Sequence, residues 1–422
     1  MTLIFSLFLT IALLFGCGNN EDKDDNMNHD MDEMDHEKMN QSDDKQGDSG
    51  NESVNVTAPS TMNPNVISRL KQLNTKNTTR LNTDDPIEMS VLVSQTIWPA
   101  THKENQPNAV ILVPLNNWQI ALASTDLIHH PNNGPVLFIE NDRIPDAVID
   151  EINRLNPPGN MNDTQVMVMG DVESAVLDAL KEYKIEHIKG ADAATFAKDV
   201  DQFYADVAKE LPQSVIIGSL ENSAMLFTLP AANWIAHMPE PILYVSKDGI
   251  PEPTKEALVK RKDNATMYIL GPEAVVSKEI EEELKEFGTV IRISGANPVD
   301  NSIAFAQYRD EKTKFGWGII DPGHGVSFVS TLSPELAVAG APFAHLGKHA
   351  PLIWVEDGKL SDATYKFFEK IKPTFTDMPT VGPYNQGFIL GSDKLIPYVT
   401  QGIIDDSLEI VKTGGGVHGG GH

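Results

Sequence analysis

The sequence predicts an α/β protein in which three units, each with a parallel sheet, follow one another along the chain. Short apolar runs at 110–113 and 136–139 show no alternation of polar and apolar residues, which is typical of strands covered on both faces. A proline followed by an apolar run recurs at 135, 241 and 351, and an apolar run that ends in glycine recurs at 170, 271 and 391. Because two independent features recur at nearly matching offsets, we interpret this part of the chain as a threefold repeat.

The first sixteen residues are almost entirely apolar, and they precede the only cysteine of the chain. A run of this length fits the core of a signal peptide and is too short for a stable transmembrane helix. It ends in Leu14-Phe15-Gly16-Cys17, which resembles the bacterial lipobox. The resemblance implies that segment 1–16 is removed as a lipoprotein signal peptide and that a lipid is attached to the Cys17 thiol. The alternative is an ordinary secretion signal with an incidental cysteine.

An acidic segment follows at 17–60, and we expect it to be a disordered tether. Positions 18–58 carry thirteen acidic residues against three lysines, and a segment with so much charge and so few apolar residues cannot offset the entropy cost of ordering. The tether contains potential ligands for copper, zinc or nickel: Met27, His29, Met31, Met34, His36 and Met39. We expect a spacer without a cofactor, and weak binding of copper or another divalent cation is the alternative. The Gly- and His-rich tail at 413–422 is expected to be flexible.

Each repeat is expected to form one α/β layer, with the three layers at 61–205, 206–310 and 311–412. Within a repeat, a helix-length stretch separates two strand-like runs, which predicts a right-handed strand–helix–strand connection. The sequences Ile144-Pro145-Asp146 and Ile250-Pro251-Glu252 place a proline near a helix start and an acidic residue in the first turn. The stretch 278–287 has apolar residues at helical spacing and a charged opposite face, which predicts a surface helix.

Several short sequences follow one another in a recognisable order over residues 80–400. Residues 241–243 read Pro-Ile-Leu, 267–271 read Met-Tyr-Ile-Leu-Gly, and 292–295 read Arg-Ile-Ser-Gly, with weaker copies of this last sequence at 80–85 and 188–192. This order resembles the type 2 cell-wall-binding repeat of Gram-positive surface proteins. The resemblance implies three Rossmann- or toprim-like units around a pseudo-threefold axis. It also implies noncovalent attachment to an anionic cell-wall polymer.

The predicted function is that of a noncatalytic lipoprotein, anchored by lipid on the extracytoplasmic face of the cell membrane, whose module binds cell-wall polymer or another envelope component. The chain has 33 basic and 60 acidic residues and a net charge of −27, which argues against nucleic acid as a partner. The same charge repels an anionic polymer unless cations screen it. The candidate ligand contacts are Asn116, Asn117, Glu221, Asn222, Asp321, Gly323 and His324.

The segment 319–325 also resembles the first zinc motif of N-acetylmuramoyl-L-alanine amidases, in which a strand end presents a histidine to a catalytic zinc ion. Such a site needs three protein ligands, an open position and a carboxylate. The candidates to join His324 there are Glu335, His345 and His349. The repeat register instead explains the segment as the strand-to-helix loop of the third unit, so we expect no catalysis. A zinc-dependent wall hydrolase is the alternative. His129 and His130 are expected to lie in an exposed loop.

Overall fold

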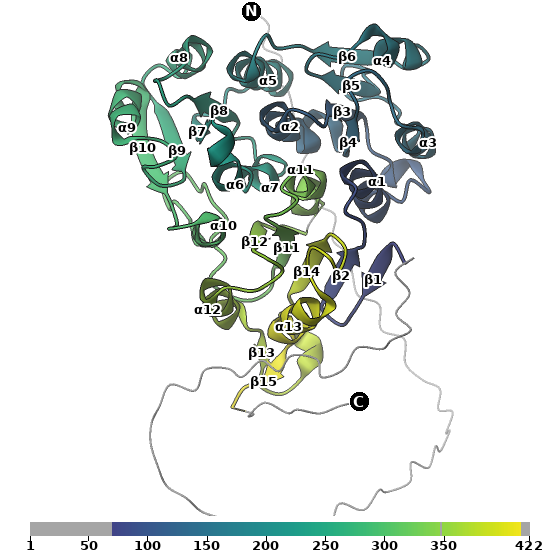
Figure 1. Cartoon of the computed structure of the whole chain (residues 1–422), viewed down its shortest axis with the longest axis vertical. Helices are drawn as coiled ribbons and strands as arrows, with labels where there is room; N and C mark the ends of the chain where they lie inside the picture. The colour runs from purple at the N-terminus through teal and green to yellow at the C-terminus, as the bar shows by residue number, and fades with distance from the viewer. Residues whose placement is uncertain (1–69, 347, 415–422) are drawn as a thin grey trace, which may run out of the picture. The chain divides into compact units, whose positions relative to one another are not determined.

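The computed structural model describes residues 70–346 and 348–414 (Figure 1). The predicted signal peptide, Cys17, the acidic tether with its methionine and histidine side chains, and most of the C-terminal tail lie outside the described residues. None of the helices in the described ranges is long and apolar enough to cross a membrane. The described residues belong to one compact unit, and most of their strands lie in three separate sheets.

Two of the sheets have the same strand order and consist of parallel strands only. The first sheet runs β4 (Val136–Ile139), β3 (Val110–Pro114), β5 (Val166–Met169), β6 (Ile185–Ile188). The second sheet runs β8 (Ile242–Val245), β7 (Ser214–Ser219), β9 (Ala265–Leu270), β10 (Gly288–Ile293). In both, the apolar runs that follow the recurring prolines form the edge strands β4 and β8. The prediction of an α/β fold with parallel sheets is therefore confirmed.

The third sheet repeats this order, but one of its strands comes from the beginning of the described chain. It runs β12 (Leu352–Val355), β11 (Gly325–Ser330), β14 (Gln386–Leu390), β2 (Thr78–Leu81), and then β1 (Gln72–Asn74), which is antiparallel to β2. Strand β2 takes the place that β6 and β10 have in the other two sheets. The segment 311–412 therefore does not contain its whole sheet, because β2 lies within the segment 61–205.

A helix follows the fourth strand of each sheet and crosses to the next unit. These helices are α1 (Pro86–Ile97), α5 (Ala193–Ala208) and α10 (Pro298–Gln307), and they pack on β4, β8 and β12 respectively (Figure 1). Each begins at an Asp or Asn whose side chain accepts a hydrogen bond from the amide three residues later, at 2.8 to 2.9 Å: Asp85, Asp192 and Asn297. Because each unit passes a helix to its neighbour in the same way, the units have the predicted pseudo-threefold arrangement.

The recurring glycines and the first residue of the Arg-Ile-Ser-Gly sequence form two sides of one contact, which we call the strand-end contact. A side chain on the fourth strand donates a hydrogen bond to the carbonyl of the glycine after the third strand. The three pairs are His187 Nε2 with Gly170, Arg292 Nη1 with Gly271, and Arg80 Nη1 with Gly391, each at 2.8 Å. The glycines have φ values of +76°, +121° and +126°, which favour glycine. The repeated short sequences are thus explained by a repeated structural role.

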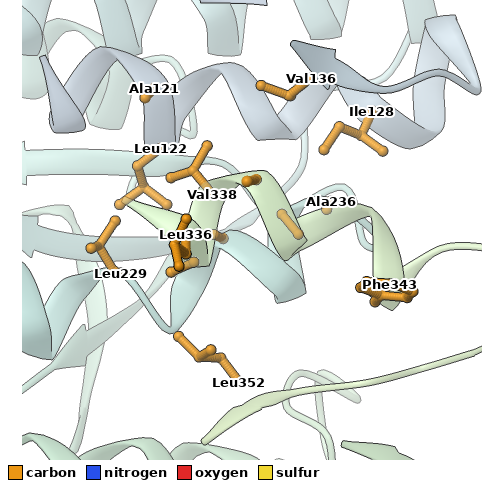
Figure 2. Packing of buried hydrophobic residues seen from close by; sticks show 14 of the residues in the cluster. Ala121, Leu122, Ile128, Val136, Leu229, Ala236, Leu336, Val338, Phe343 and Leu352 are labelled. Atoms are coloured by element: carbon orange, nitrogen blue, oxygen red, sulfur yellow. The ribbon is translucent and has the colours of Figure 1, made fainter. Parts of the chain in front are cut away.

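The centre of the described part is formed by one helix from each unit, which lies between the first two strands of that unit. These are α2 (Trp118–Ser124), α7 (Ala231–Ile235) and α11 (Leu336–Gly340), and α7 packs against both of the others. Their buried apolar side chains meet between the ribbons in Figure 2, among them Leu122 and Val338. This packing joins residues of all three units into one hydrophobic core.

Other helices cover the sheets, and two of them begin where the sequence predicts. Helices α3 (Asp146–Leu155) and α8 (Glu252–Val259) start directly after Pro145 and Pro251. The stretch 278–287 forms α9 (Lys278–Leu284) and a short 3-10 turn. The remaining α-helices and strands are α4 (Ser174–Ala179), α6 (Met225–Thr228), α12 (Asp362–Ile371), α13 (Tyr398–Leu408), β13 (Thr374–Phe375) and β15 (Val411–Lys412).

Candidate functional site

The candidate residues of the first unit, Asn116 and Asn117, lie directly after β3. Asn117 is the N-cap of α2, because its Oδ1 atom accepts a hydrogen bond from the Ile120 amide at 3.1 Å. Asn116 is exposed. Asn117 therefore has a structural role, and Asn116 is the one of the two whose side chain faces solvent.

The candidate residues of the second unit, Glu221 and Asn222, lie after β7, and Asn222 contacts the first unit. Asn222 Oδ1 accepts a hydrogen bond from Trp118 Nε1 at 3.1 Å, across the boundary between the units. Glu221 Oε1 accepts one from the Lys247 amide at 3.2 Å. The structure therefore brings the candidates of the first two units to the same boundary, where these two side chains hold turns and join the units.

The candidate residues of the third unit lie at the opposite end of their strand. Because β11 begins at Gly325, the residues Asp321, Gly323 and His324 precede the strand. The prediction that they line a strand-to-helix loop at its carboxyl end is therefore wrong. The third set of candidates does not correspond in position to the sets after β3 and β7.

The physical reason for this error is the apolar segment 318–320, which resembles a strand in the sequence. In the structure the Ile319 amide donates to the Ala306 carbonyl at 2.9 Å, so the segment packs beside the end of α10. The true strand, β11, is fully buried although its sequence contains Ser327 and Ser330. An apolar pattern alone points to the wrong segment in this unit.

His324 and Gly323 line a pocket of about 510 Å³ at the amino ends of β11 and β14. The other residues that line it are Trp317, Ile319, Gly325, Lys348, His349, Tyr384, Gln386 and Phe388. Tyr384 is 53% exposed and His349 is also exposed. The pocket combines aromatic surface with a lysine, two imidazoles and an amide, so it can pack against an apolar face of a ligand and hydrogen-bond to its polar groups.

Buried Asn385 fixes the loop that carries His324. The amides of Gly323 and His324 both donate to Asn385 Oδ1, at 2.8 and 3.1 Å, and Asn385 Nδ2 donates to the Ile371 carbonyl at 2.6 Å. His324 Nε2 lies 3.2 Å from Asp321 Oδ1, and that carboxylate is largely exposed. The loop is therefore held through its backbone, and the imidazole is placed at the pocket wall.

The residues proposed to join His324 around a zinc ion do not form such a group with it. Within residues 70–346 and 348–414, no set of three His, Cys, Asp or Glu side chains that includes His324 places its ligand atoms within 4.8 Å of one another. His345 belongs to a different group, and Glu335 lies just before α11, where burial raises the pKa of its carboxyl group. The geometry thus does not assemble the predicted three-ligand site at His324.

A histidine from each unit does meet at another place, and the sequence analysis did not identify this group. His129, His237 and His345 each offer one ring nitrogen, and these atoms all lie within 4.8 Å of one another. The ring centroids of His129 and His345 are 4.7 Å apart, and those of His129 and His237 are 6.0 Å apart. The available signal was the spacing, because each histidine follows the previous one by 108 residues.

The expectation of an exposed loop at His129 and His130 is therefore only partly correct. His129 is exposed, but it lies in the short helical segment Ile128–Asn132, and its Nδ1 atom donates to the carbonyl of His237 at 2.8 Å. His130 is half-buried, with its ring 5.8 Å from that of Tyr204. Both residues thus contact parts of the fold that are distant in sequence.

Burial determines the protonation of two imidazoles in this group. It lowers the pKa of His237 and of His345 to about 4, and the neighbouring histidines lower both values further. Both side chains are therefore neutral at neutral pH. A neutral imidazole carries one nitrogen that donates and one that has a free lone pair.

Comparison with known proteins identifies the fold through solved structures only. No family model and no curated protein matches the chain. Cwp6 from Clostridium difficile matches with a TM-score of 0.61 at 15% identity, over 79% of this chain and 48% of that one. Cwp8 from the same organism matches with a TM-score of 0.61 at 17% identity, over 78% of this chain and 52% of that one. The chain shares the fold of Cwp6 and Cwp8.

This likeness has a defined extent. The chain spans about half the length of Cwp6 and of Cwp8, so each of them has a large part without a counterpart in the match. At 15% and 17% identity the likeness concerns the path of the backbone. The roles of individual side chains must therefore be argued from the contacts in this chain.

Proposed function

We propose that the protein is a noncatalytic cell-surface lipoprotein whose three-unit module binds a cell-wall polymer or another envelope component. The pocket at the amino ends of β11 and β14 is the observation that supports this most directly. The likeness of the chain's fold to two cell wall proteins, Cwp6 and Cwp8, is consistent with a location in the cell envelope. The order of short sequences over residues 80–400 points to the same class of protein.

The chemistry of the pocket suits a saccharide polymer that carries anionic groups. Tyr384 and Trp317 offer ring faces that can pack against the apolar face of a sugar. Lys348 supplies a positive charge, and His324 and Gln386 supply hydrogen-bonding groups for phosphate, carboxylate or hydroxyl oxygens. A polymer is favoured over a small ligand because the pocket is open at exposed Tyr384.

The charge of the protein makes this binding dependent on salt. A net charge of −27 repels an anionic polymer at long range, so the contacts in the pocket must supply the attraction. At 0.1 M salt, the repulsion between exposed charges that are more than about 10 Å apart is largely screened. We therefore expect binding to strengthen as salt is raised from very low concentration, in contrast to a complex formed by a basic surface.

Binding can be tested by co-sedimentation of the mature chain carrying Cys17→Ser with purified cell walls, before and after the anionic polymer is stripped. We expect binding to the intact walls and its loss after stripping.

Tyr384→Ala and Lys348→Ala should each weaken binding by about three- to tenfold, because each removes one contact of about 1 kcal/mol. Leu332→Ala and Lys359→Ala are the matched controls, since both residues are exposed and neither lines the pocket. Equal binding to stripped walls, with Tyr384→Ala unchanged, would contradict this function.

Anchoring to the membrane is the second part of the proposal, and it is supported by the sequence Leu14-Phe15-Gly16-Cys17. Because Cys17 is the only cysteine, Cys17→Ser removes the single thiol that could accept a lipid. We expect the variant to lose its lipid and to leave the membrane fraction or accumulate unprocessed. Partition into detergent and electrophoretic mobility measure this directly, and unchanged values in the variant would argue against a lipid anchor.

A further inference from the structure

The group formed by His129, His237 and His345 arises from the repeat itself. Each histidine comes shortly after a central helix, α2, α7 or α11, that lies between the first two strands of its unit. These three helices pack together at the centre of the described part (Figure 2). The threefold repeat therefore delivers one imidazole from each unit to one place, which a chance cluster of surface histidines would not do.

We infer that His129, His237 and His345 form a binding site for one divalent transition-metal ion. One nitrogen from each ring lies within 4.8 Å of the other two. Three imidazoles on a single zinc ion, at Zn–N distances of about 2.0–2.1 Å, place their nitrogens about 3.3 Å apart. Small side-chain rotations would bring the nitrogens to this separation, and exposed His129 is the least confined of the three.

Two of the imidazoles already have the partner that a metal-binding histidine needs on its other nitrogen. His129 Nδ1 donates to the His237 carbonyl at 2.8 Å, and His345 Nε2 donates to Asn133 Oδ1 at 2.8 Å. Each bond selects the tautomer, because its acceptor is an oxygen atom, and leaves the second nitrogen with a lone pair. The available atoms are therefore Nε2 of His129 and Nδ1 of His345.

The third imidazole has a nitrogen whose hydrogen-bonding capacity is unused. His237 Nδ1 is buried, and no hydrogen-bond partner for it exists among the residues that the structure describes. Buried polar atoms are nearly always paired, so this atom requires an explanation. A metal ion between the three rings would give it a partner and would remove the cost of its burial.

The ligand set selects the class of metal. Three neutral imidazoles suit zinc, and also copper(II), nickel and cobalt, whereas calcium and magnesium require oxygen ligands. With three protein ligands, one position remains for water or a ligand. The exposed His349 lies next to this group, with its ring centroid 4.4 Å from that of His237.

The metal site adjoins the pocket described above without depending on its function. Trp317 and His349 both line the pocket, and both rings contact His237, with centroids at 6.3 and 4.4 Å. A bound ion would add positive charge next to a pocket in a strongly acidic protein. Metal binding can be measured with the ion alone, so failure of polymer binding would leave this inference intact.

The inference is tested by titrating the full mature chain with Zn²⁺, beside the variants His129→Ala and His130→Ala. His129 is exposed, so its removal leaves no cavity in the core, and the adjacent His130 is the matched control because it is outside the group. Loss of a direct ligand should exceed the 10–100-fold effect of losing an outer partner, so we expect His129→Ala to weaken one zinc site by more than about 100-fold. His130→Ala should bind like the parent chain.

Zinc bound elsewhere does not disturb this comparison. The segment 27–39 and the C-terminal histidines are identical in the parent and in both variants, so their contribution cancels in the difference. Equal stoichiometry and affinity for the parent chain and His129→Ala would overturn the inference. The volume-preserving variant His345→Gln, which keeps an amide near Asn133, gives a second and independent loss of the same site.

The unfolding midpoint supplies a second measurement that is confined to the folded part. An ion that binds the native fold but not the unfolded chain raises Tm, and the rise grows with the ratio of the free ion concentration to Kd. We expect Zn²⁺ to raise the Tm of the parent chain and of His130→Ala, a chelator to reverse this, and His129→Ala to show no zinc-dependent rise. A rise of the same size in His129→Ala would also overturn the inference.

Discussion

The second and third sheets contain the same strand-end contact, but they build it from very different parts of the chain. In the second sheet, Arg292 binds the Gly271 carbonyl, 21 residues earlier. In the third sheet, Arg80 binds the Gly391 carbonyl, 311 residues later. The local contact is the same in both, yet only in the third sheet does it join the two ends of the described chain. A repeated short sequence therefore indicates a local structure without indicating which strand it completes.

The surroundings of the two arginines differ as well. Arg292 pairs with Glu281 at 2.6 Å and its side chain is partly exposed. Arg80 is fully buried, and its other hydrogen bonds go to the Ile396 carbonyl and to Gln401 Oε1, both at 2.7 Å. Because the guanidinium is buried, desolvation lowers the pKa of Arg80 to about 10. The contact that completes the third sheet thus depends on buried, uncharged partners.

The largest expected effect is the loss of this closing contact in Arg80→Ala. The substitution leaves buried acceptors without a donor, so the free energy of unfolding should fall by about 3–5 kcal/mol. Arg292→Ala should lose less, about 1–3 kcal/mol, because water can replace part of its contacts. Chemical denaturation of the two variants and the parent chain measures both values. Equal losses would mean that the third sheet is closed mainly by its other contacts.

The residue before each recurring proline differs among the units and gives a second comparison. It is Gly134 in the first unit, Glu240 in the second and Ala350 in the third. Glu240 Oε2 accepts a hydrogen bond from Trp234 Nε1 at 2.9 Å, and burial raises the pKa of Glu240 to about 7. Only the second unit therefore has an ionisable group at this position.

This carboxyl group should make stability depend on pH. Because its folded-state pKa lies above the unfolded value, its protonation favours the native state below about pH 4.5, and this stabilisation is lost as the pH rises through 7. Glu240→Gln keeps the acceptor for Trp234 and cannot ionise. Relative to the parent chain, the variant should therefore gain about 2–3 kcal/mol between pH 5 and pH 8. Chemical denaturation at both pH values measures this gain. If the free energies of unfolding of the two proteins change equally with pH, the pKa of Glu240 is not raised by folding.

Removal of the N-cap side chain should destabilise the three helices that connect successive units by the same amount. This comparison tests whether the three units are alike in stability as well as in structure. Asp85, Asp192 and Asn297 cap α1, α5 and α10 with bonds of 2.8 to 2.9 Å. Substitution of each by Ala should cost about 1 kcal/mol. A much larger loss for Asp85→Ala, measured by thermal unfolding, would indicate that α1 also stabilises the contact between the third sheet and the first unit.

The elements that the sequence predicts are those with local causes. Buried parallel strands need continuous apolar runs, so the runs after Pro135, Pro241 and Pro351 locate β4, β8 and β12. Helix starts require particular residues at fixed offsets, so Pro145 and Pro251 locate α3 and α8. In each case the residues that determine the element lie within or beside it.

The elements that the sequence does not predict depend on partners far along the chain. The pairing of β2 with β14 is set by the closed arrangement of three units, and no property of 78–81 names its neighbour. Strand β11 contains two serines, so its sequence looks less apolar than 318–320. These serines are nevertheless buried, because other elements pack against the strand. The equal spacing of the three histidines is visible in the sequence, but only the packing of α2, α7 and α11 brings them together.

The smallest expected effect is that of His324→Ala, which compares the loop before β11 with the histidine group nearby. The His324 imidazole is half-buried, and its polar contact is with an exposed carboxylate at 3.2 Å. The backbone of its loop is held by Asn385 whether or not the imidazole is present. Stability should therefore change by no more than about 0.5 kcal/mol.

No amidase activity should be lost in His324→Ala, because a catalytic zinc ion needs three protein ligands. Among the described residues, the group that offers three is His129, His237 and His345, and His324 is not part of it. The assay is release of stem peptides from purified peptidoglycan, with and without Zn²⁺, by the parent chain and by the variants His324→Ala and His129→Ala. Release by the parent chain that disappears in His324→Ala but persists in His129→Ala would establish a wall hydrolase at the pocket. Absence of release from all three proteins, with zinc uptake reduced only in His129→Ala, would separate a binding pocket from a metal site that lies beside it.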